Sequence, residues 1–431
     1  MFFLADSNEI NVKLSDLNSL KMKKLLPFFA VLVSLNCIAQ CDGNRYLNYI
    51  FNDVQVTSDV PYGENLKNDG TNQILLCDVY EPTGDNVSNR PAVVVAHGGF
   101  FLSGSKTGPD VVPICERLAK MGYVAISMEY RLGVTITANL AGPMTEAVMR
   151  GVQDGKAAVR FLRKTVAVDG NPYNIDPSEI YIAGSSAGGY IALHMAYLDE
   201  MAELPAYVNT SNPGLTGELE GDSGNPGYPS DVKAIVNICG AIGDTAWIHT
   251  GDEPALLFHG TNDQTVPYGS AMQYAFGVAP VVEVDGSHSI NEKMDQVGLE
   301  HCFEIYEGQD HVPHMTNTAI LDTTMSIMSN FLTHHICSIP LDCSYRTITV
   351  GTEELTALEE DLLVYPNPAS SNVFISSNDL KQIEVYNMTG ALVKTEFNSN
   401  RMEVSSLPNG LYVFRLTTSK GKTNKTVLIQ H

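Results

Sequence analysis

Short apolar runs and amphipathic segments alternate through the middle of the chain. The runs are rich in β-branched residues, whereas the longer segments repeat their apolar residues at helical spacing. This α/β order predicts a mostly parallel, doubly wound sheet with helices on both faces. We expect strands at 74–80, 92–96, 124–129, 180–183, 234–238, 255–258 and 302–306. We expect helices at 111–121, 145–166, 187–198, 268–276 and 315–334.

The pattern changes to a period of two near the C-terminus. Apolar and polar residues alternate in short runs that turn residues separate, which is typical of a small all-β sandwich. The strands are expected at 373–377, 382–387, 392–397, 402–407, 411–417 and 426–430, with turns at 388–390, 408–410 and 420–422. The acidic and polar segment 351–361 is the predicted linker to this module, which spans 362–431.

The N-terminal pattern predicts an export signal. Three lysines precede an apolar run at 25–38, which is shorter than the roughly 18 residues that span a bilayer. Small residues stand at the −3 and −1 positions for cleavage before Gln40. We therefore expect 1–39 to be a signal peptide, and Met22 is a candidate start with 1–21 as an upstream extension. A buried core helix is the alternative, but Pro27 and the charged flank argue against it.

Composition and charge narrow the possible functions. The chain has 431 residues, of which 44% are hydrophobic and 17% charged, so it can bury a core and is not disordered throughout. Its formal charge is −23, and residues 40–361 hold 15 basic and 42 acidic side chains. This acidity argues against a nucleic-acid partner, which needs a concentrated basic face. The segment 362–431 holds 7 basic and 4 acidic residues, which marks it as separate.

Export places the cysteines in an oxidising compartment. Cleavage before Gln40 leaves seven of them, so we expect some to pair and at least one to stay free. Cys337 and Cys343 flank a short loop and are the first candidates for a pair. A lipid anchor on Cys41 is a weaker alternative. No cysteines have the CxxC spacing of a zinc site, so we expect no structural metal, and no cofactor is predicted.

The motif with the most chemical content is a GxSxG at 184–188. It lies directly after a predicted strand and directly before a predicted helix. A reactive hydroxyl on such a sharp turn needs small neighbours, because side chains two residues away would collide. Ser186 is therefore the predicted nucleophile. His97-Gly98-Gly99 follows another predicted strand. The predicted oxyanion donors are the backbone amides of Gly98, Gly99 and Ala187.

An acid and a base complete the set at later strand ends. Asp263 follows the strand at 255–258, and His311 follows the strand at 302–306, which gives the chain order Ser, Asp, His. Asp263 is the preferred orienting acid and His311 the preferred base. The alternatives that stay open are Asp244 and Asp252 for the acid and His314, His288 and His301 for the base.

These motifs together resemble the α/β-hydrolase superfamily, and within it the secreted carboxylesterase and lipase-like branch. The resemblance covers about residues 70–335 and includes Tyr130-Arg131-Leu132-Gly133 and the helix at 153–163. It implies hydrolysis of a carboxylic ester through an acyl-enzyme, without a cofactor. Phe100 stands where related sequences carry a third glycine, which leaves the pair of oxyanion donors open. A glycine common in relatives after the histidine is replaced here by Val312.

Three ordered motifs in the C-terminal module carry a second resemblance. They are Tyr365-Pro366-Asn367-Pro368, the run 385–390 and the run 407–412. The module is similar to the type IX secretion (Por) sorting domain of Bacteroidota, which implies transit through that machinery to the outer membrane, with release or surface attachment. An ordinary carbohydrate-binding or adhesive sandwich is the alternative.

The substrate is the least determined feature. We expect a small or polymer-attached ester, such as an acylated polysaccharide or a polyester. A prolyl-oligopeptidase-type serine peptidase is an alternative, although only some 50 residues would precede the His97 strand after cleavage, too few for a propeller. A non-enzymatic adhesin on the same fold is a third. The polar segment 199–231 is expected either to shape the substrate pocket or to be a surface excursion. Phe100, Phe101 and Trp247 are candidate pocket walls.

Overall fold

A computed structural model describes residues 40–349, 362–377, 379–387, 392–418 and 421–431. These residues form two compact units, which divide between positions 350 and 351. The predicted signal peptide at 1–39, the predicted linker at 351–361 and the predicted turn at 388–390 lie outside the described residues. Within the described part of the chain, no helix combines the length and the apolar character that crossing a membrane requires.

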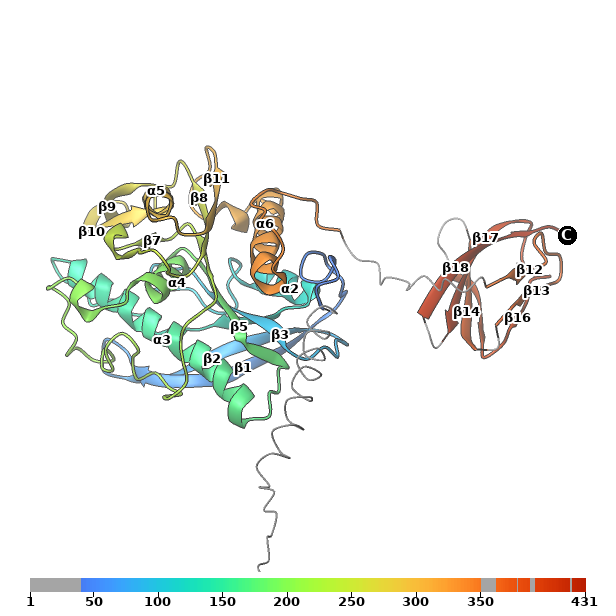
Figure 1. Ribbon diagram of the computed structural model, residues 1–431, viewed down its shortest axis with the longest axis horizontal. Helices are drawn as coiled ribbons and strands as arrows, with labels where there is room; N and C mark the ends of the chain where they lie inside the picture. The colour runs from blue at the N-terminus through green and yellow to red at the C-terminus, as the bar shows by residue number, and fades with distance from the viewer. Residues whose placement is uncertain (1–39, 350–361, 378, 388–391, 419–420) are drawn as a thin grey trace, which may run out of the picture. The chain divides into compact units, whose positions relative to one another are not determined.

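A twisted eight-stranded sheet runs through the first unit (Figure 1). Its strand order is β1-β2-β4-β3-β5-β6-β8-β11. The pairs β1–β2 and β2–β4 are antiparallel, and every other neighbouring pair is parallel, as predicted. The strands are β1 (Val54–Leu66), β2 (Asn72–Pro82), β3 (Arg90–Ala96), β4 (Val124–Met128), β5 (Ile175–Ser185), β6 (Ile235–Ile238), β8 (Ala255–Gly260) and β11 (His301–Tyr306).

Helices cover both faces of this sheet, which the α/β pattern predicts. The buried residues of α2 (Val112–Met121) and α6 (Thr318–Cys337) belong to one hydrophobic core. Those of α3 (Ala141–Val168), α4 (Ala187–Tyr197) and α5 (Ser287–Val297) belong to the other. In Figure 1, α2 and α6 lie together, apart from the long helix α3. The parallel strands β3, β5, β6, β8 and β11 therefore end at one sheet edge between two packed helical layers, where loops can carry function.

The predicted helix at 268–276 is wrong, because this segment contains the strand β9 (Ser270–Ala275). β9 pairs with β10 (Ala279–Gly286), which pairs in turn with β7 (Ala241–Ile242) in a separate antiparallel sheet. The side chains of Gln273 and Ala275 are buried and that of Tyr274 between them is exposed, which is a strand period. Alanine, methionine and glutamine favour a helix locally, but pairing with β10 overrides that preference.

Two disulfides correct the predicted cysteine pairing. Cys41 bonds Cys337 and Cys302 bonds Cys343, with Cα atoms 5.6 and 5.5 Å apart respectively. Cys337 is the last residue of α6 and meets the beginning of the described chain, while the loop after it runs back to the start of β11. The Cys41 sulfur is therefore already bonded, which argues against the lipid anchor. The free cysteines among the described residues are Cys77, Cys115 and Cys239, and all three are buried.

The second unit consists of two antiparallel sheets, as the period-two pattern predicts. One has the order β12-β13-β16 and the other β15-β14-β17-β18. Buried side chains such as those of Val373, Ile383 and Phe414 form its core. The strands are β12 (Val364–Tyr365), β13 (Asn372–Ile375), β14 (Leu380–Asn387), β15 (Leu392–Phe397), β16 (Arg401–Glu403), β17 (Gly410–Thr418) and β18 (Gly421–Ile429).

Candidate active site

Ser186 occupies a strained turn between β5 and α4. Its backbone has φ 53° and ψ −114°, a conformation that side-chain-bearing residues rarely adopt. A Cβ atom on Gly184 would lie 2.0 Å from the Gly188 carbonyl oxygen, and one on Gly188 would lie 2.0 Å from the Ala96 oxygen. The glycines of the motif are thus sterically required. The turn holds the Ser186 side chain at the carboxyl end of the sheet.

His311 links Ser186 to Asp263 by hydrogen bonds. Its Nε2 lies 2.8 Å from Ser186 Oγ, and its Nδ1 lies 2.7 Å from Asp263 Oδ2. Because an ionised carboxylate only accepts, we assign the His311 proton to Nδ1, which leaves Nε2 free to accept from the serine hydroxyl. The structure therefore brings together the three residues that the sequence singled out, in the relative positions that general-base activation of a serine requires.

Asp263 is held as an ionised group. Its side chain is fully buried, and Oδ1 accepts hydrogen bonds from the amides of Thr265 and Val266 at 2.8 Å each. Burial alone would raise the pKa of this carboxyl, but hydrogen bonds from His259 and His311 outweigh it and hold the pKa well below its ordinary value. A negative charge therefore faces the His311 ring.

His259 is a member of the site that the sequence analysis missed. It is fully buried at the end of β8, and its Nε2 lies 3.3 Å from Asp263 Oδ2. Its other ring nitrogen lies 2.7 Å from Ser287 Oγ, which also accepts from the side-chain amide of Asn237 at 3.1 Å. A buried polar chain thus supports Asp263 from behind. Its signal in the sequence was a histidine four residues before the acid, at the strand end.

The loop after β3 corrects one predicted oxyanion donor. The Gly98 amide donates to the buried carboxylate of Asp110 at 2.6 Å, so it is not available to a substrate. Over the described residues, the amides of Gly99, Phe100 and Ala187 have no hydrogen-bond partner. Phe100 has φ 58°, and the loop lies against the nucleophile, since a Cβ on Gly98 would be 3.1 Å from Ser186 Cβ. These three amides are the free donors next to Ser186.

The competing candidates are occupied elsewhere. Each alternative acid accepts a hydrogen bond from a nearby backbone amide, and each alternative base faces a group outside the Ser186 cluster. Asp244 accepts from Ala246 and Asp252 from His249, while His314 faces the Asp110 carbonyl, His301 faces Asn291 and His288 faces Glu292. No hydrogen bond joins any of these residues to Ser186 within the described chain.

Asp263 and His311 also lie near Cys239, so that a nitrogen, an oxygen and a sulfur fall within 4.8 Å of one another. This arrangement does not suit a metal ion. Burial raises the pKa of the Cys239 thiol to about 12, so the sulfur is protonated, and the other two groups already share a hydrogen bond of 2.7 Å. The cluster is better described as a hydrogen-bonded pair beside a neutral thiol.

A mostly apolar cavity of about 200 Å³ opens beside Ser186. The predicted walls Phe100, Phe101 and Trp247 all line it. The polar segment 199–231 also contributes to the wall through Glu203, Leu204, Pro205 and Tyr207, as one of its two predicted roles required. Further walls come from α3 and from β10, the latter in a hairpin that the sequence analysis did not predict. Its lining also includes Met144, Val148, Met149, Leu198, Val281, Val282 and Val284.

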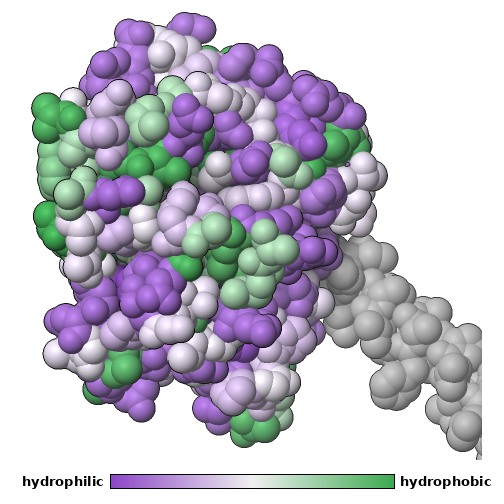
Figure 2. Space-filling model, turned by 90° about the vertical axis from the view of Figure 1, so that its left-hand side faces the viewer, coloured by the Kyte–Doolittle hydropathy of each residue, from purple (hydrophilic) through white to green (hydrophobic). Residues whose placement is uncertain are grey.

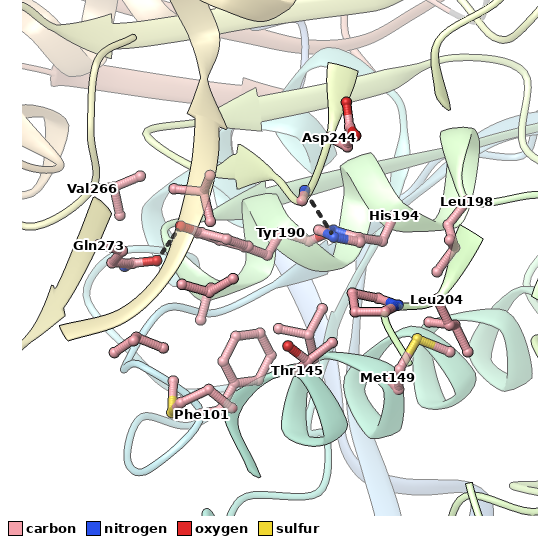
Figure 3. Close-up of a pocket in the computed structure, with 18 of the residues that line it drawn as sticks. Phe101, Thr145, Met149, Tyr190, His194, Leu198, Leu204, Asp244, Val266 and Gln273 are labelled. Atoms are coloured by element: carbon pink, nitrogen blue, oxygen red, sulfur yellow. Dashed lines mark hydrogen bonds between the residues drawn. The ribbon is translucent and has the colours of Figure 1, made fainter. Parts of the chain in front are cut away.

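Two hydrogen bonds join polar groups that line the cavity (Figure 3). The Tyr190 hydroxyl donates to Gln273 at 2.5 Å, and the Gly243 amide donates to His194 Nε2 at 3.3 Å. Burial lowers the pKa of His194 to about 4, so this ring is neutral at pH 7. No lysine or arginine is among the described lining residues, while Glu203 and Asp244 are. The cavity is therefore suited to an apolar, uncharged group.

The tip of the β9–β10 hairpin places apolar side chains near the site. Phe276 is 77% exposed, and its ring centroid lies 6.2 Å from that of Phe100 in the loop after β3. Val278 beside it is also exposed. Figure 2 views the unit from the side on which β9 and β10 lie, and apolar side chains gather there in separate groups among hydrophilic ones. Exposed apolar surface therefore continues outside the cavity.

Family models match both units. Residues 77–243 match the model described as BD-FAE, and residues 363–430 match the secretion system C-terminal sorting domain. The first match includes Ser186 and ends before Asp263 and His311.

Known proteins resemble parts of the chain. It is 34% identical over 145 residues to the non-reducing polyketide synthase atr1 of Stereocaulon alpinum, covering 33% of this chain and 5% of the synthase. It is 27% identical over 288 residues to the probable isoprenylcysteine alpha-carbonyl methylesterase ICMEL1 of Oryza sativa subsp. japonica, covering 61% and 58% respectively. The chain thus spans less than two thirds of either relative.

A solved structure of Thermogutta terrifontis esterase 2 is also similar, with a TM-score of 0.47 and 22% identity over 65% of this chain and 94% of that one. Together with the mostly parallel sheet and its two helical layers, the family matches identify the architecture. The chain contains an α/β-hydrolase domain of the BD-FAE family, followed by a secretion-system C-terminal sorting domain.

Proposed function

We propose that this protein is a secreted serine carboxylic-ester hydrolase. The observation that carries the proposal is the hydrogen-bonded line from Ser186 through His311 to Asp263, beside an apolar cavity. The domain match and the esterases among the similar proteins make ester hydrolysis the appropriate reaction class. Residues 40–350 would form the catalytic domain and 351–361 the linker to the sorting domain.

The proposed reaction proceeds in two steps. His311 Nε2 takes the proton of Ser186 as its Oγ forms a bond to the ester carbonyl carbon. The carbonyl oxygen becomes an oxyanion, which the amides of Gly99, Phe100 and Ala187 are free to stabilise. The intermediate then breaks its bond to the alcohol oxygen, which receives the proton from His311, and Ser186 keeps the acyl group.

Water completes the cycle. His311 removes a proton from a water molecule, whose oxygen attacks the acyl carbon through a second oxyanion. When this intermediate breaks, the carboxylic acid leaves and Ser186 regains its proton from His311. The ionised Asp263 stabilises the imidazolium in both steps. Activity should fall in acid, because a protonated His311 cannot act as the base.

The cavity supports a preference for esters with a medium-sized apolar group. Its volume of about 200 Å³ exceeds what a methyl group needs, and its walls carry no basic side chain among the described residues. Acyl groups that end in a free carboxylate would meet Glu203 and Asp244 instead of a cation. Esters attached to a polysaccharide or a polyester fit the proposal, provided that the chain itself stays outside the cavity.

The sorting domain supports secretion through the type IX machinery. We propose that an N-terminal signal peptide at 1–39 directs the chain across the inner membrane, and that its source is a member of Bacteroidota. Mass spectrometry of protein recovered from the medium and from the cell surface would identify both ends of the mature chain. A mature form that retains residues 1–39 would contradict the signal-peptide proposal.

A panel of chromogenic esters of increasing acyl length, with an aminoacyl amide, tests the enzymatic proposal. Ser186→Ala should lower kcat by at least 10³-fold, as the loss of a catalytic nucleophile does. Ser185→Ala is the matched control, because the Ser185 hydroxyl is buried without a hydrogen-bond partner among the described residues. If the wild type and Ser186→Ala hydrolyse every ester equally slowly, the proposal fails. Cleavage of the amide but not of esters would favour the peptidase alternative.

A further inference from the structure

Two histidines and a glutamate meet at the end of the hydrolase sheet opposite to Ser186. His334 and His335 lie in the last turn of α6, and Glu300 directly precedes β11. His334 Nε2 is 3.2 Å and His335 Nε2 is 3.6 Å from the same carboxylate oxygen, Glu300 Oε1. The three atoms all lie within 4.8 Å of one another. Such convergence on one point is the arrangement that a shared cation requires.

The Nε2 atoms of both rings face the point of convergence. His334 Nδ1 donates to the Ile339 carbonyl, which only accepts, and this bond orients the ring so that Nε2 faces Glu300. His335 Nε2 is buried and has no hydrogen-bond partner among the described residues. The side chain of His335 is only 9% exposed. A cation at this point would give the unpartnered Nε2 of His335 a partner and would also contact the Glu300 carboxylate.

Among the described residues, no lysine or arginine forms an ion pair with Glu300. Lys233 is the nearby cation that acts on His335, but its Nζ is bound to Glu179 at 2.6 Å. The hydrogen bond of His334 to a backbone carbonyl is also what orients metal-binding histidines in other proteins.

Both disulfides hold the backbone on either side of this cluster. Cys337, two residues after His335, is bonded to Cys41, and Cys302, two residues after Glu300, is bonded to Cys343. The end of α6 and the start of β11 are therefore fixed next to the cluster. The side chains that bear the ligand atoms then lose less conformational entropy when an ion binds. A preorganised set of three ligands results.

We propose that Glu300, His334 and His335 bind a divalent transition-metal cation of the zinc class. Two imidazole nitrogens and one carboxylate oxygen suit zinc, nickel or copper, whereas magnesium and calcium prefer oxygen ligands alone. A water molecule would occupy the remaining position. The expectation that no structural metal is present rested on cysteine spacing, which has no bearing on a site of histidine and glutamate.

The site joins the end of α6 to the start of β11 and is remote from the chemistry. β11 runs from His301 to Tyr306, or about 17 Å at strand spacing, before the loop that carries His311. The bound ion therefore stabilises the fold and takes no part in ester hydrolysis. This inference is independent of the proposed function.

Calorimetric titration of the whole protein with zinc chloride tests the proposal, after treatment with a chelator and without an affinity tag. We expect one bound ion per chain, a higher Tm with zinc and at least tenfold weaker binding in His334→Ala and His335→Ala. His288→Ala is the matched control, because His288 is an exposed histidine that also faces a glutamate, Glu292, at 3.7 Å. It should bind zinc as the wild type does.

Two outcomes would overturn the proposal. Binding and the Tm response could persist in both His334→Ala and His335→Ala, or they could be lost in His311→Ala, which would place the ion at the active site. His334 is 21% exposed, so its substitution tests the ligand even if that of the more buried His335 impairs folding. Cobalt provides a second readout, since its visible absorption in the wild type should report nitrogen ligation and should be lost in His334→Ala.

Discussion

Asp110 holds the loop that carries two of the free amides, so we predict that Asp110→Ala impairs catalysis without touching the nucleophile. Its carboxylate is buried and accepts from the Gly98 amide at 2.6 Å. A hydrogen bond to a charged group contributes about 1.5–3 kcal/mol. Loss of that bond would release Gly99 and Phe100 from their positions and weaken their stabilisation of the oxyanion. Each 1.36 kcal/mol added to the activation free energy lowers the rate tenfold. We therefore expect kcat to fall by about 10- to 150-fold.

Asp110→Asn is the matched variant, because its amide oxygen can still accept from Gly98. It should retain more of kcat than Asp110→Ala does. Steady-state kinetics on a butyrate ester measure the effect, and KM should change little because the loop amides act on the oxyanion that forms during reaction. Thermal unfolding verifies that each variant is folded. A folded Asp110→Ala whose kcat stays within twofold of the wild type would refute the role assigned to this hydrogen bond.

Three other predictions concern stability and specificity. The Cys41–Cys337 disulfide closes a loop of 296 residues and the Cys302–Cys343 disulfide a loop of 41. In the chain-entropy model, Cys41→Ser should therefore lower the free energy of unfolding, measured in urea, by about 2 kcal/mol more than Cys302→Ser does, and equal losses would contradict the model. Leu204→Trp should fill the cavity and reduce hydrolysis of long-chain esters while acetate esters are retained, and a uniform loss over the ester panel would argue against this wall. The pKa of Asp263 is depressed, so its ionised carboxylate stabilises the fold above pH 3.8 and this stabilisation is lost progressively as the pH falls below that value. Asp263→Asn should therefore have a lower Tm than the wild type at pH 7, and the difference in Tm should shrink toward pH 3.

The sequence predicted the features that local sterics determine. The turn at Ser186 needs glycines two residues away on both sides, and that requirement is visible as a motif. The parallel strands that precede Asp263 and His311 are short apolar runs with clear boundaries, so their chain order could be predicted. The structure then places all three side chains within hydrogen-bond distance.

The features that escaped prediction depend on contacts between distant segments. The amide of Gly98 is engaged by Asp110 at the other end of the same loop, and no local pattern indicates which amide a carboxylate will bind. Nothing in the sequence distinguishes His259 from an ordinary core histidine, because its role depends on its contacts with Ser287 and Asp263 in the folded chain. The strand β9 resembles a helix in composition and is determined by its partner β10. Cysteine pairing likewise depends on which segments of the chain the fold brings together.

The chain between Asp263 and His311 leaves the sheet after β8 and returns to it as β11, the neighbouring parallel strand. The segment between β8 and β11, which includes the β9–β10 hairpin that lines the cavity, is therefore an insertion whose two ends lie on neighbouring strands. The tip of the β9–β10 hairpin can change in length and sequence while the acid and the base keep their places after adjacent strands, whereas Ser287 at the start of α5 has to stay because it contacts His259. Exchange of this hairpin would therefore alter one wall of the cavity separately from the residues that support Asp263.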